Sequence, residues 1–141
     1  MGSKLRTASW IMLAVVGVLV LLVSLLSAGL AYRGDFPVGG VAIGEIASGR
    51  EAVLVGLRGA RGTAAAWAAA WAVLFLTVVV GPYRRGDVSS WWGILASLLA
   101  LGAVSGARVL FIGTATGTPY ALLVLGMVGL LLDVKRLSGP R

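Results

Sequence analysis

Cysteine and histidine are both absent from the chain, and only 5 of its 141 residues are acidic. Their absence excludes disulfides, Cys or His zinc sites, iron–sulfur clusters, His-ligated haem and histidine general bases. The acids lie at the ends of apolar runs or between them, whereas a proton or ion pathway normally needs a carboxylate at membrane depth. No Ser-His-Asp set, paired carboxylates or phosphate-cradling loop occurs either. The sequence therefore predicts a non-enzymatic protein with no metal and no cofactor.

Charge of any sign is scarce. Charged residues make up 12% of the chain and hydrophobic residues 59%, whereas soluble domains have about 25% and 45–50%. So little polar surface cannot cover a water-soluble core, which predicts an integral membrane protein. The net charge is +7, and the basic residues cluster at the ends of apolar runs without interleaved aromatics. This placement favours contact with anionic lipid headgroups and argues against nucleic acid.

Four apolar runs predict an all-α membrane protein, a single domain over 1–141 with four transmembrane helices in an antiparallel bundle. The first run, Trp10 to Tyr32, would span about 34 Å as a helix, enough to cross a hydrocarbon core of about 30 Å. Because a cleaved signal has only about 7–15 apolar residues, we expect this run to be retained. The predicted helices cover about 9–32, 62–82, 89–112 and 118–136.

The segment 33–61 is predicted to be an outer loop rich in glycine. Ser48 and Glu51 have the spacing of a capping box, and Val53, Leu54 and Leu57 share one helical face. We therefore expect a short helix at about 49–58 on the membrane surface. The preceding residues, 36–46, are compatible with a loop or with a short irregular hairpin.

The basic residues also predict an orientation, because cytoplasmic loops carry an excess of lysine and arginine. With the amino terminus inside, the inner side holds more of them: Lys4, Arg6, Arg84, Arg85, Lys135, Arg136 and Arg141. The outer side holds Arg33, Arg50, Arg58 and Arg61. Both termini are therefore predicted to be cytoplasmic. The preference for arginine, glycine, alanine, leucine and valine indicates a GC-rich bacterial source, and hence the bacterial inner membrane.

Small residues recur at helical spacing within the apolar runs. Small side chains let helix backbones approach closely in lipid. The expected packing positions are Gly93, Ser97, Gly102, Gly106, Gly126 and Gly129, together with Gly17, Ser24 and Ala28 on the first run. They predict packing within the bundle, with a homodimer contact as the alternative.

Three further residues are candidates for ligand or lipid contact. Trp67 and Trp71 lie four positions apart and so share a helical face. Arg108 lies about 25 Å along its helix from Trp91, near the outer end, where its side chain can reach the headgroups. Bundle packing and interfacial anchoring explain all three. The alternative is a cavity between helices for a lipophilic or anionic small molecule.

The segment 81–92, GPYRRGDVSSWW, is predicted to be an anchoring turn on the cytoplasmic side. Gly81 and Pro82 would end one helix, and Asp87, Ser89 or Ser90 would cap the next. Tyr83, Trp91 and Trp92 would sit at headgroup level. Arg84 and Arg85 would meet anionic lipid, with Asp133 as a further partner.

The same turn resembles one in a group of small, uncharacterised four-helix bacterial membrane proteins. In that group an Arg-Arg-Gly-acidic sequence joins helices two and three and is followed by a tryptophan-rich helix start, as at residues 84–87 and 91–92 here. Where the group has a basic residue and another aromatic, this chain has Val88 and Ser89. The resemblance implies the fold, and brings no ligand or reaction with it. The lack of membrane-depth acids and of metal ligands, together with the many small-residue packing positions, leads us to expect an accessory or interaction subunit, whose partner is a membrane protein or a second copy of the chain.

Overall fold

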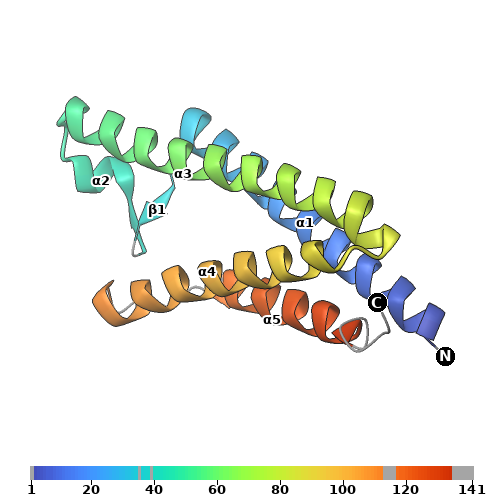
Figure 1. The fold of residues 1–141 in the computed structure, drawn as a ribbon. Coiled ribbons are helices and arrows are strands. Elements are labelled where there is room, and N and C mark those ends of the chain that lie inside the picture. The colour runs from blue at the N-terminus through green and yellow to red at the C-terminus, as the bar shows by residue number, and fades with distance from the viewer. Residues whose placement is uncertain (1, 35, 39, 113–116, 135–141) are drawn as a thin grey trace. The chain divides into compact units, whose positions relative to one another are not determined.

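The computed structural model describes residues 2–34, 36–38, 40–112 and 117–134. Over these residues it contains five α-helices, one π-helical turn and a two-stranded hairpin (Figure 1). In chain order the elements are α1 (Gly2–Arg33), β1 (Pro37–Val38), β2 (Val41–Ala42), α2 (Ile43–Ala47), α3 (Glu51–Val78), η1 (Val79–Tyr83), α4 (Val88–Ile112) and α5 (Gly117–Leu131). The chain divides into two compact units, residues 19–73 and residues 1–18 with 74–141. We describe each unit separately.

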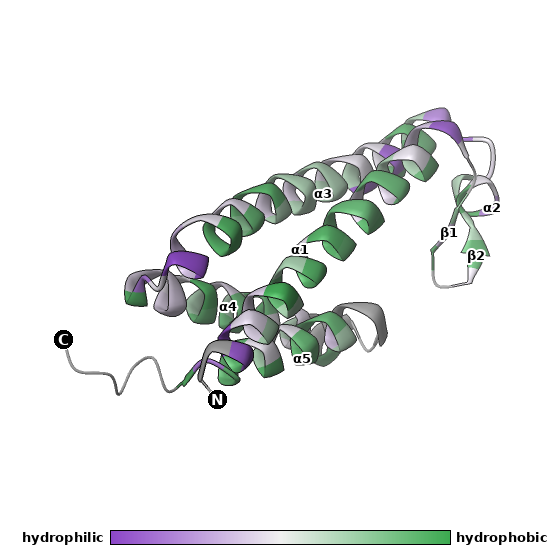
Figure 2. Cartoon of the chain, turned by 90° about the vertical axis from the view of Figure 1, so that its right-hand side faces the viewer, coloured by the Kyte–Doolittle hydropathy of each residue, from purple (hydrophilic) through white to green (hydrophobic). Residues whose placement is uncertain are grey.

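Three helices are long and apolar enough to cross a membrane: α1, α3 with its continuation η1, and α4. Apolar side chains cover α1 on all sides, and Leu22, Leu25, Leu26 and Leu30 are at least half exposed. A helix that is apolar all round is typical of a membrane span. Figure 2 shows the same pattern, with hydrophilic residues gathered near helix ends.

The fourth predicted span is shorter than expected. The α-helix of α5 ends at Leu131 instead of continuing to residue 136, and residues 135–136 lie outside the described part of the chain. Its 15 residues extend about 22 Å, against a core of about 30 Å. Within residues 2–34, 36–38, 40–112 and 117–134, the structure thus has three helices of spanning length and one shorter apolar helix, Tyr120–Leu131.

In the unit of residues 19–73, the predicted surface helix at 49–58 is wrong. Residues 51–78 form one continuous helix, so the connection between α1 and α3 is limited to about 34–50. The capping box is also wrong, because Ser48 is the left-handed C-cap of α2 and its hydroxyl donates to the carbonyl of Glu45 at 2.9 Å. The irregular hairpin left open by the sequence does form, with β1 and β2 pairing Pro37 with Ala42.

Contacts with the end of α1 explain why the glycines of α3 do not interrupt it. A helical glycine costs about 1 kcal/mol relative to alanine. Against this cost, Leu54 and Leu57 pack on a cluster of Ala31, Phe36 and Ile43. Arg61 lies over the Phe36 ring at 4.1 Å and donates from Nε to the Ser27 hydroxyl at 3.1 Å. Gly62 lies directly against the ring of Tyr32, where any side chain would collide.

In the other unit, α4 and α5 form an antiparallel helical hairpin (Figure 1). Leu123 reaches within 3.2 Å of the position that a Cβ on Gly102 would occupy, and Leu98 within 3.0 Å of that position on Gly126. At one end the Tyr120 hydroxyl donates to the Ser105 carbonyl at 2.8 Å. At the other end the Trp91 indole N–H donates to the Leu130 carbonyl at 3.3 Å. Each helix therefore packs a leucine against a glycine of the other helix.

The helix that leads into the 84–87 turn ends in a π-helical turn that contains Pro82. Proline lacks the N–H that an α-helix needs at this position, and a π turn accommodates the missing bond. As a result, Gly81 and Pro82 do not end the helix where the sequence suggests. It continues to Tyr83, whose side chain is fully buried.

Candidate functional site

The turn between η1 and α4 reverses the chain within four residues. Gly86 has φ of +105°, a left-handed conformation that glycine adopts at no steric cost. Its N–H donates to the Tyr83 carbonyl at 3.0 Å, and the Asp87 N–H donates to the Pro82 carbonyl at 3.1 Å. A guanidinium nitrogen of Arg6 lies 3.0 Å from where a Cβ on Gly86 would be. The turn therefore needs glycine both for its backbone and for the approach of Arg6.

Asp87 is the N-cap of α4. Its carboxylate accepts from the backbone N–H of Ser89 at 3.2 Å and of Ser90 at 2.9 Å, and from the Ser90 hydroxyl at 2.5 Å. The hydrogen bonds from the side chain and backbone of Ser90 lower the pKa of Asp87 below its ordinary value of 3.8. Of the three candidate caps, Asp87 is the one that accepts these bonds, and it faces the positive end of the helix dipole.

The Asp87 cap predicts a dependence of stability on pH. Because its pKa is lowered on folding, its contribution is complete above pH 3.8 and is lost as the pH falls through the lowered folded value. Asp87→Asn keeps a hydrogen-bond acceptor but has no charge that titrates. The melting temperature of the variant should therefore fall less than that of the wild type when the pH is lowered. Melting in detergent from neutral pH to below the Asp87 pKa measures this. Glu45→Gln, which removes an exposed acid outside the turn, is the control and should keep the full drop.

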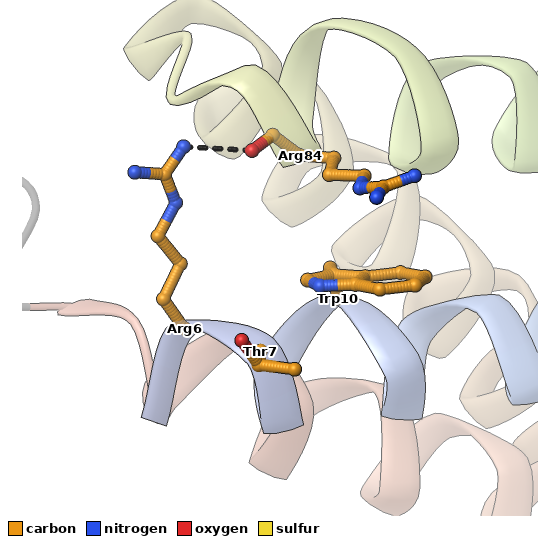
Figure 3. A pocket seen from close by; sticks show the side chains of 4 residues that line it. All are labelled: Arg6, Thr7, Trp10 and Arg84. Carbon is orange, nitrogen blue, oxygen red and sulfur yellow. Dashed lines mark hydrogen bonds between the residues drawn. The ribbon is translucent and has the colours of Figure 1, made fainter. Parts of the chain in front are cut away.

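Beside this turn, four residues line an open pocket of about 390 Å³. Arg6, Thr7 and Trp10 come from the first turns of α1, and Arg84 comes from the turn (Figure 3). A guanidinium nitrogen of Arg6, Nη2, donates to the Arg84 carbonyl at 2.7 Å. The guanidinium of Arg84 lies over the Trp10 ring, 4.8 Å from its centroid. The described contacts of both cationic side chains are thus with a carbonyl and an aromatic ring, and neither contact neutralises a charge.

A buried hydrogen-bond chain fixes α1 beside the turn and α5. The Ser9 hydroxyl donates to the Gly129 carbonyl at 2.6 Å and lies 2.6 Å from the Tyr83 hydroxyl. A serine hydroxyl has one proton, so Tyr83 must be the donor to Ser9. Gly129 lies in the last turn of α5, where carbonyls have no partner within the helix. Ser9 therefore caps α5 from α1, about one turn from Arg6 and next to Trp10 in the sequence.

The aromatic residues of the turn do not share one role. Tyr83 is 0% exposed and Trp91 4% exposed, whereas Trp92 is 55% exposed. The first two pack inward and form hydrogen bonds, and only Trp92 is open to the surroundings; the headgroup level of all three stays a prediction. Their hydroxyl and indole N–H satisfy partners on α1 and α5, and burial is the arrangement that allows those bonds.

The charged residues of the turn also separate. Both arginines are exposed, but only Arg84 is among the residues that line the pocket. Asp133 is buried, at 8% exposure. The guanidinium of Arg84 stacks on Trp10, and the pairing of Asp133 with Arg84 or Arg85 stays a prediction.

The small residues divide between packed and open positions. Gly17, Gly102, Gly126 and Gly129 each lie within 3.2 Å of a neighbouring side chain at the position of a Cβ. At Gly93 and Gly106 a Cβ would meet no described atom within 4 Å, so neither packs against another described helix. Ser97 is half-buried.

The predicted cavity residues are not brought into one described site. Trp67 is 74% exposed and Trp71 is half-buried, and both belong to the unit of residues 19–73. The side chain of Arg108, in the other unit, lies outside the described residues. The cavity between helices therefore stays a prediction.

Arg6, Ser9 and Trp10 were not identified from the sequence as site residues. Arg6 and Trp10 are four apart and share a face of α1, which is a signal for a common environment. The partner on the other side of the pocket is 78 positions away in the chain, and no local pattern indicates that contact.

Together these features define an α-helical protein with three helices long and apolar enough for a membrane and a basic pocket at the first turns of α1. No protein-family model matches the chain, and neither a curated protein nor a solved structure gave a significant match.

Proposed function

We propose that the chain is a four-span protein of the bacterial cytoplasmic membrane, with both termini inside, that acts as a non-enzymatic accessory or interaction subunit. The excess of basic residues at the amino terminus, the 84–85 turn and the carboxyl terminus supports this orientation. As the fourth span, α5 would be short, and snorkelling basic residues at its end would help it to cross.

The observation that carries the interaction role is an open face of small residues on α4. Its members are spaced three and four apart and so lie on one side of the helix: Gly93, Ala96, Ala100, Ala103 and Ala107. The first four are exposed and Ala107 is half-exposed. Leu98 and Gly102, which pack on α5, point from the opposite side. After the α4–α5 contact is made, α4 thus keeps a second face of the kind that membrane helices use for close packing.

Native mass spectrometry in mild detergent tests this role on the full chain from its own membrane. We expect a second copy or a copurifying membrane protein. Ala100→Leu adds bulk to the centre of the open face, and we expect it to lower the associated fraction by about tenfold or more, since close backbone approach is lost.

The matched control is Ala121→Leu, the same change at an exposed alanine of α5, which should leave association unchanged. A wild-type chain that is strictly monomeric and brings no partner would contradict the proposed role. Equal loss in both variants would contradict the assignment to the α4 face.

A further inference from the structure

We propose that the pocket of Arg6, Thr7, Trp10 and Arg84 binds a phosphate group, with Arg6 and Arg84 as its cationic ligands. This proposal depends on the membrane location proposed above, but it does not depend on binding to a protein partner. A strictly monomeric protein would contradict the interaction role but not the phosphate site.

The first argument is the uncompensated charge. Two guanidinium groups line one pocket of about 390 Å³, and their described contacts are a backbone carbonyl for Arg6 and an aromatic face for Arg84. In the described part of the chain, neither forms an ion pair with a carboxylate. The acid of the turn, Asp87, is occupied by Ser89 and Ser90 at the start of α4. An anion is the partner that this pair of cations lacks.

The second argument is preorganisation. The bond from Arg6 to the Arg84 carbonyl uses one guanidinium nitrogen, Nη2, and a guanidinium has five N–H donors. Stacking on Trp10 fixes the plane of the Arg84 guanidinium, and Figure 3 shows this group over the ring, on the side away from the Arg6 guanidinium. Because these side chains are already held, an anion would bind without the full entropic cost of ordering two long arginines.

The third argument concerns which anion fits. A planar guanidinium donates two parallel hydrogen bonds to phosphate, and such charge-assisted bonds are stronger than neutral ones. Figure 3 shows the nitrogen edge of the Trp10 indole on the side of Arg6 and Thr7, where its N–H can add a donor. The pocket volume lies near the lower end of the range for small-molecule sites, about 300–1,000 Å³. These features suit a single phosphate group.

The position in the chain indicates two sources of that phosphate. The pocket lies at the start of the long apolar part of α1, where tryptophan and arginine commonly sit at headgroup level. An anionic phospholipid would bring its phosphate there with its acyl chains along the helices, and soluble phosphate would reach the same donors from the cytoplasm. Both sources would bind to the same donors through a phosphate group, so the experiment must distinguish phospholipid from soluble phosphate.

Native mass spectrometry of the full chain, delipidated in mild detergent, gives that separation. The probes are phosphatidylglycerol, a diacylglycerol with the same acyl chains but no phosphate, and inorganic phosphate. We expect one phosphatidylglycerol to be retained with at least about tenfold higher affinity than diacylglycerol, and Arg84→Gln and Arg6→Gln each to lower this affinity about tenfold. Displacement of the lipid by inorganic phosphate, with loss of phosphate binding in Arg84→Gln, would support the site with soluble phosphate as its source.

The matched control is Arg85→Gln, which removes the same charge from the next residue, outside the pocket. We expect it to change the affinity by less than about threefold, because diffuse attraction is weak beside direct contact. An equal loss in Arg85→Gln and Arg84→Gln would overturn the pocket as the site. Equal retention of phosphatidylglycerol and diacylglycerol, without binding of phosphate, would overturn phosphate recognition.

A second variant guards against misfolding. Arg84→Lys keeps the charge but loses the planar fork and its stacking on Trp10, so it should bind several-fold more weakly while its circular dichroism matches the wild type. Wild-type affinity in Arg84→Lys would show that charge alone suffices and would overturn the proposed geometry.

Discussion

Replacing Arg84 and Arg85 together by glutamate is expected to leave most molecules without a single transmembrane orientation. Basic residues near span ends determine orientation through the positive-inside rule, whereas acidic residues contribute little. In the proposed topology, the double change removes both basic residues of the cytoplasmic turn and leaves the arginines of the outer side in excess around α3. If the turn faces anionic lipid as proposed, the change also replaces attraction to the headgroups by repulsion, and this attraction is worth about 1 kcal/mol per basic residue near the surface.

Reporter fusions measure this result. A reporter inserted in the exposed turn at Ser48 to Arg50 and one at the carboxyl terminus should give opposite signals in the wild type, and mixed signals in the glutamate variant. The control, Arg84→Lys with Arg85→Lys, keeps both charges and should retain wild-type topology, although it should weaken phosphate binding at the pocket. Unchanged reporter signals in the glutamate variant would show that the turn does not orient the protein.

The lysine control separates the two roles proposed for Arg84, which are orienting the chain in the membrane and binding phosphate. Topology depends on charge at the turn, which lysine supplies equally well. Phosphate binding as proposed depends on the guanidinium fork and on its stacking over Trp10. A single set of variants therefore distinguishes anchoring of the chain from recognition of a ligand.

The apolar runs predict the long helices well because a membrane span depends mainly on local composition and length. The start of α3 is where local reasoning fails. Gly56, Gly59 and Gly62 favour a break on propensity, but the helix continues from Glu51. Arg61 bonds to Ser27, and Gly62 admits the ring of Tyr32. These contacts join residues more than 25 positions apart, so tertiary packing outweighs a propensity that the sequence shows locally.

The site was predictable in part for a related reason. Asp87 follows from the rules for helix caps, which depend on two or three neighbouring residues. The basic pocket depends on Arg6 and Trp10 meeting Arg84. Arg84 and Arg85 are adjacent and both exposed, and nothing in the sequence indicates which of them stacks on Trp10. Likewise, Gly93 and Gly126 look alike in sequence, although Leu98 packs closely only on Gly126.

The hydrogen-bond chain through Ser9 gives the second large prediction. Ser9→Ala should lower the free energy of unfolding by about 2–3 kcal/mol, as two hydrogen bonds between helices are lost, each worth up to about 1.7 kcal/mol, and a buried carbonyl loses its partner. Ser9 is fully buried, so water cannot easily replace the donor to Gly129. Reversible unfolding in mixed micelles measures the change.

Two further variants on the same scale identify the cause. Ser24, the other buried serine of α1, donates only to the Val20 carbonyl of its own helix at 2.7 Å, so Ser24→Ala should cost less than about 0.5 kcal/mol. Tyr83→Phe removes the donor to Ser9 but leaves the bond from Ser9 to Gly129, and should cost about 1 kcal/mol. A cost for Ser24→Ala as large as that for Ser9→Ala would mean that serine burial, and not the cap on α5, is what stabilises this end of the protein. If Tyr83→Phe cost more than Ser9→Ala, the proton order Tyr83 to Ser9 to Gly129 would be wrong.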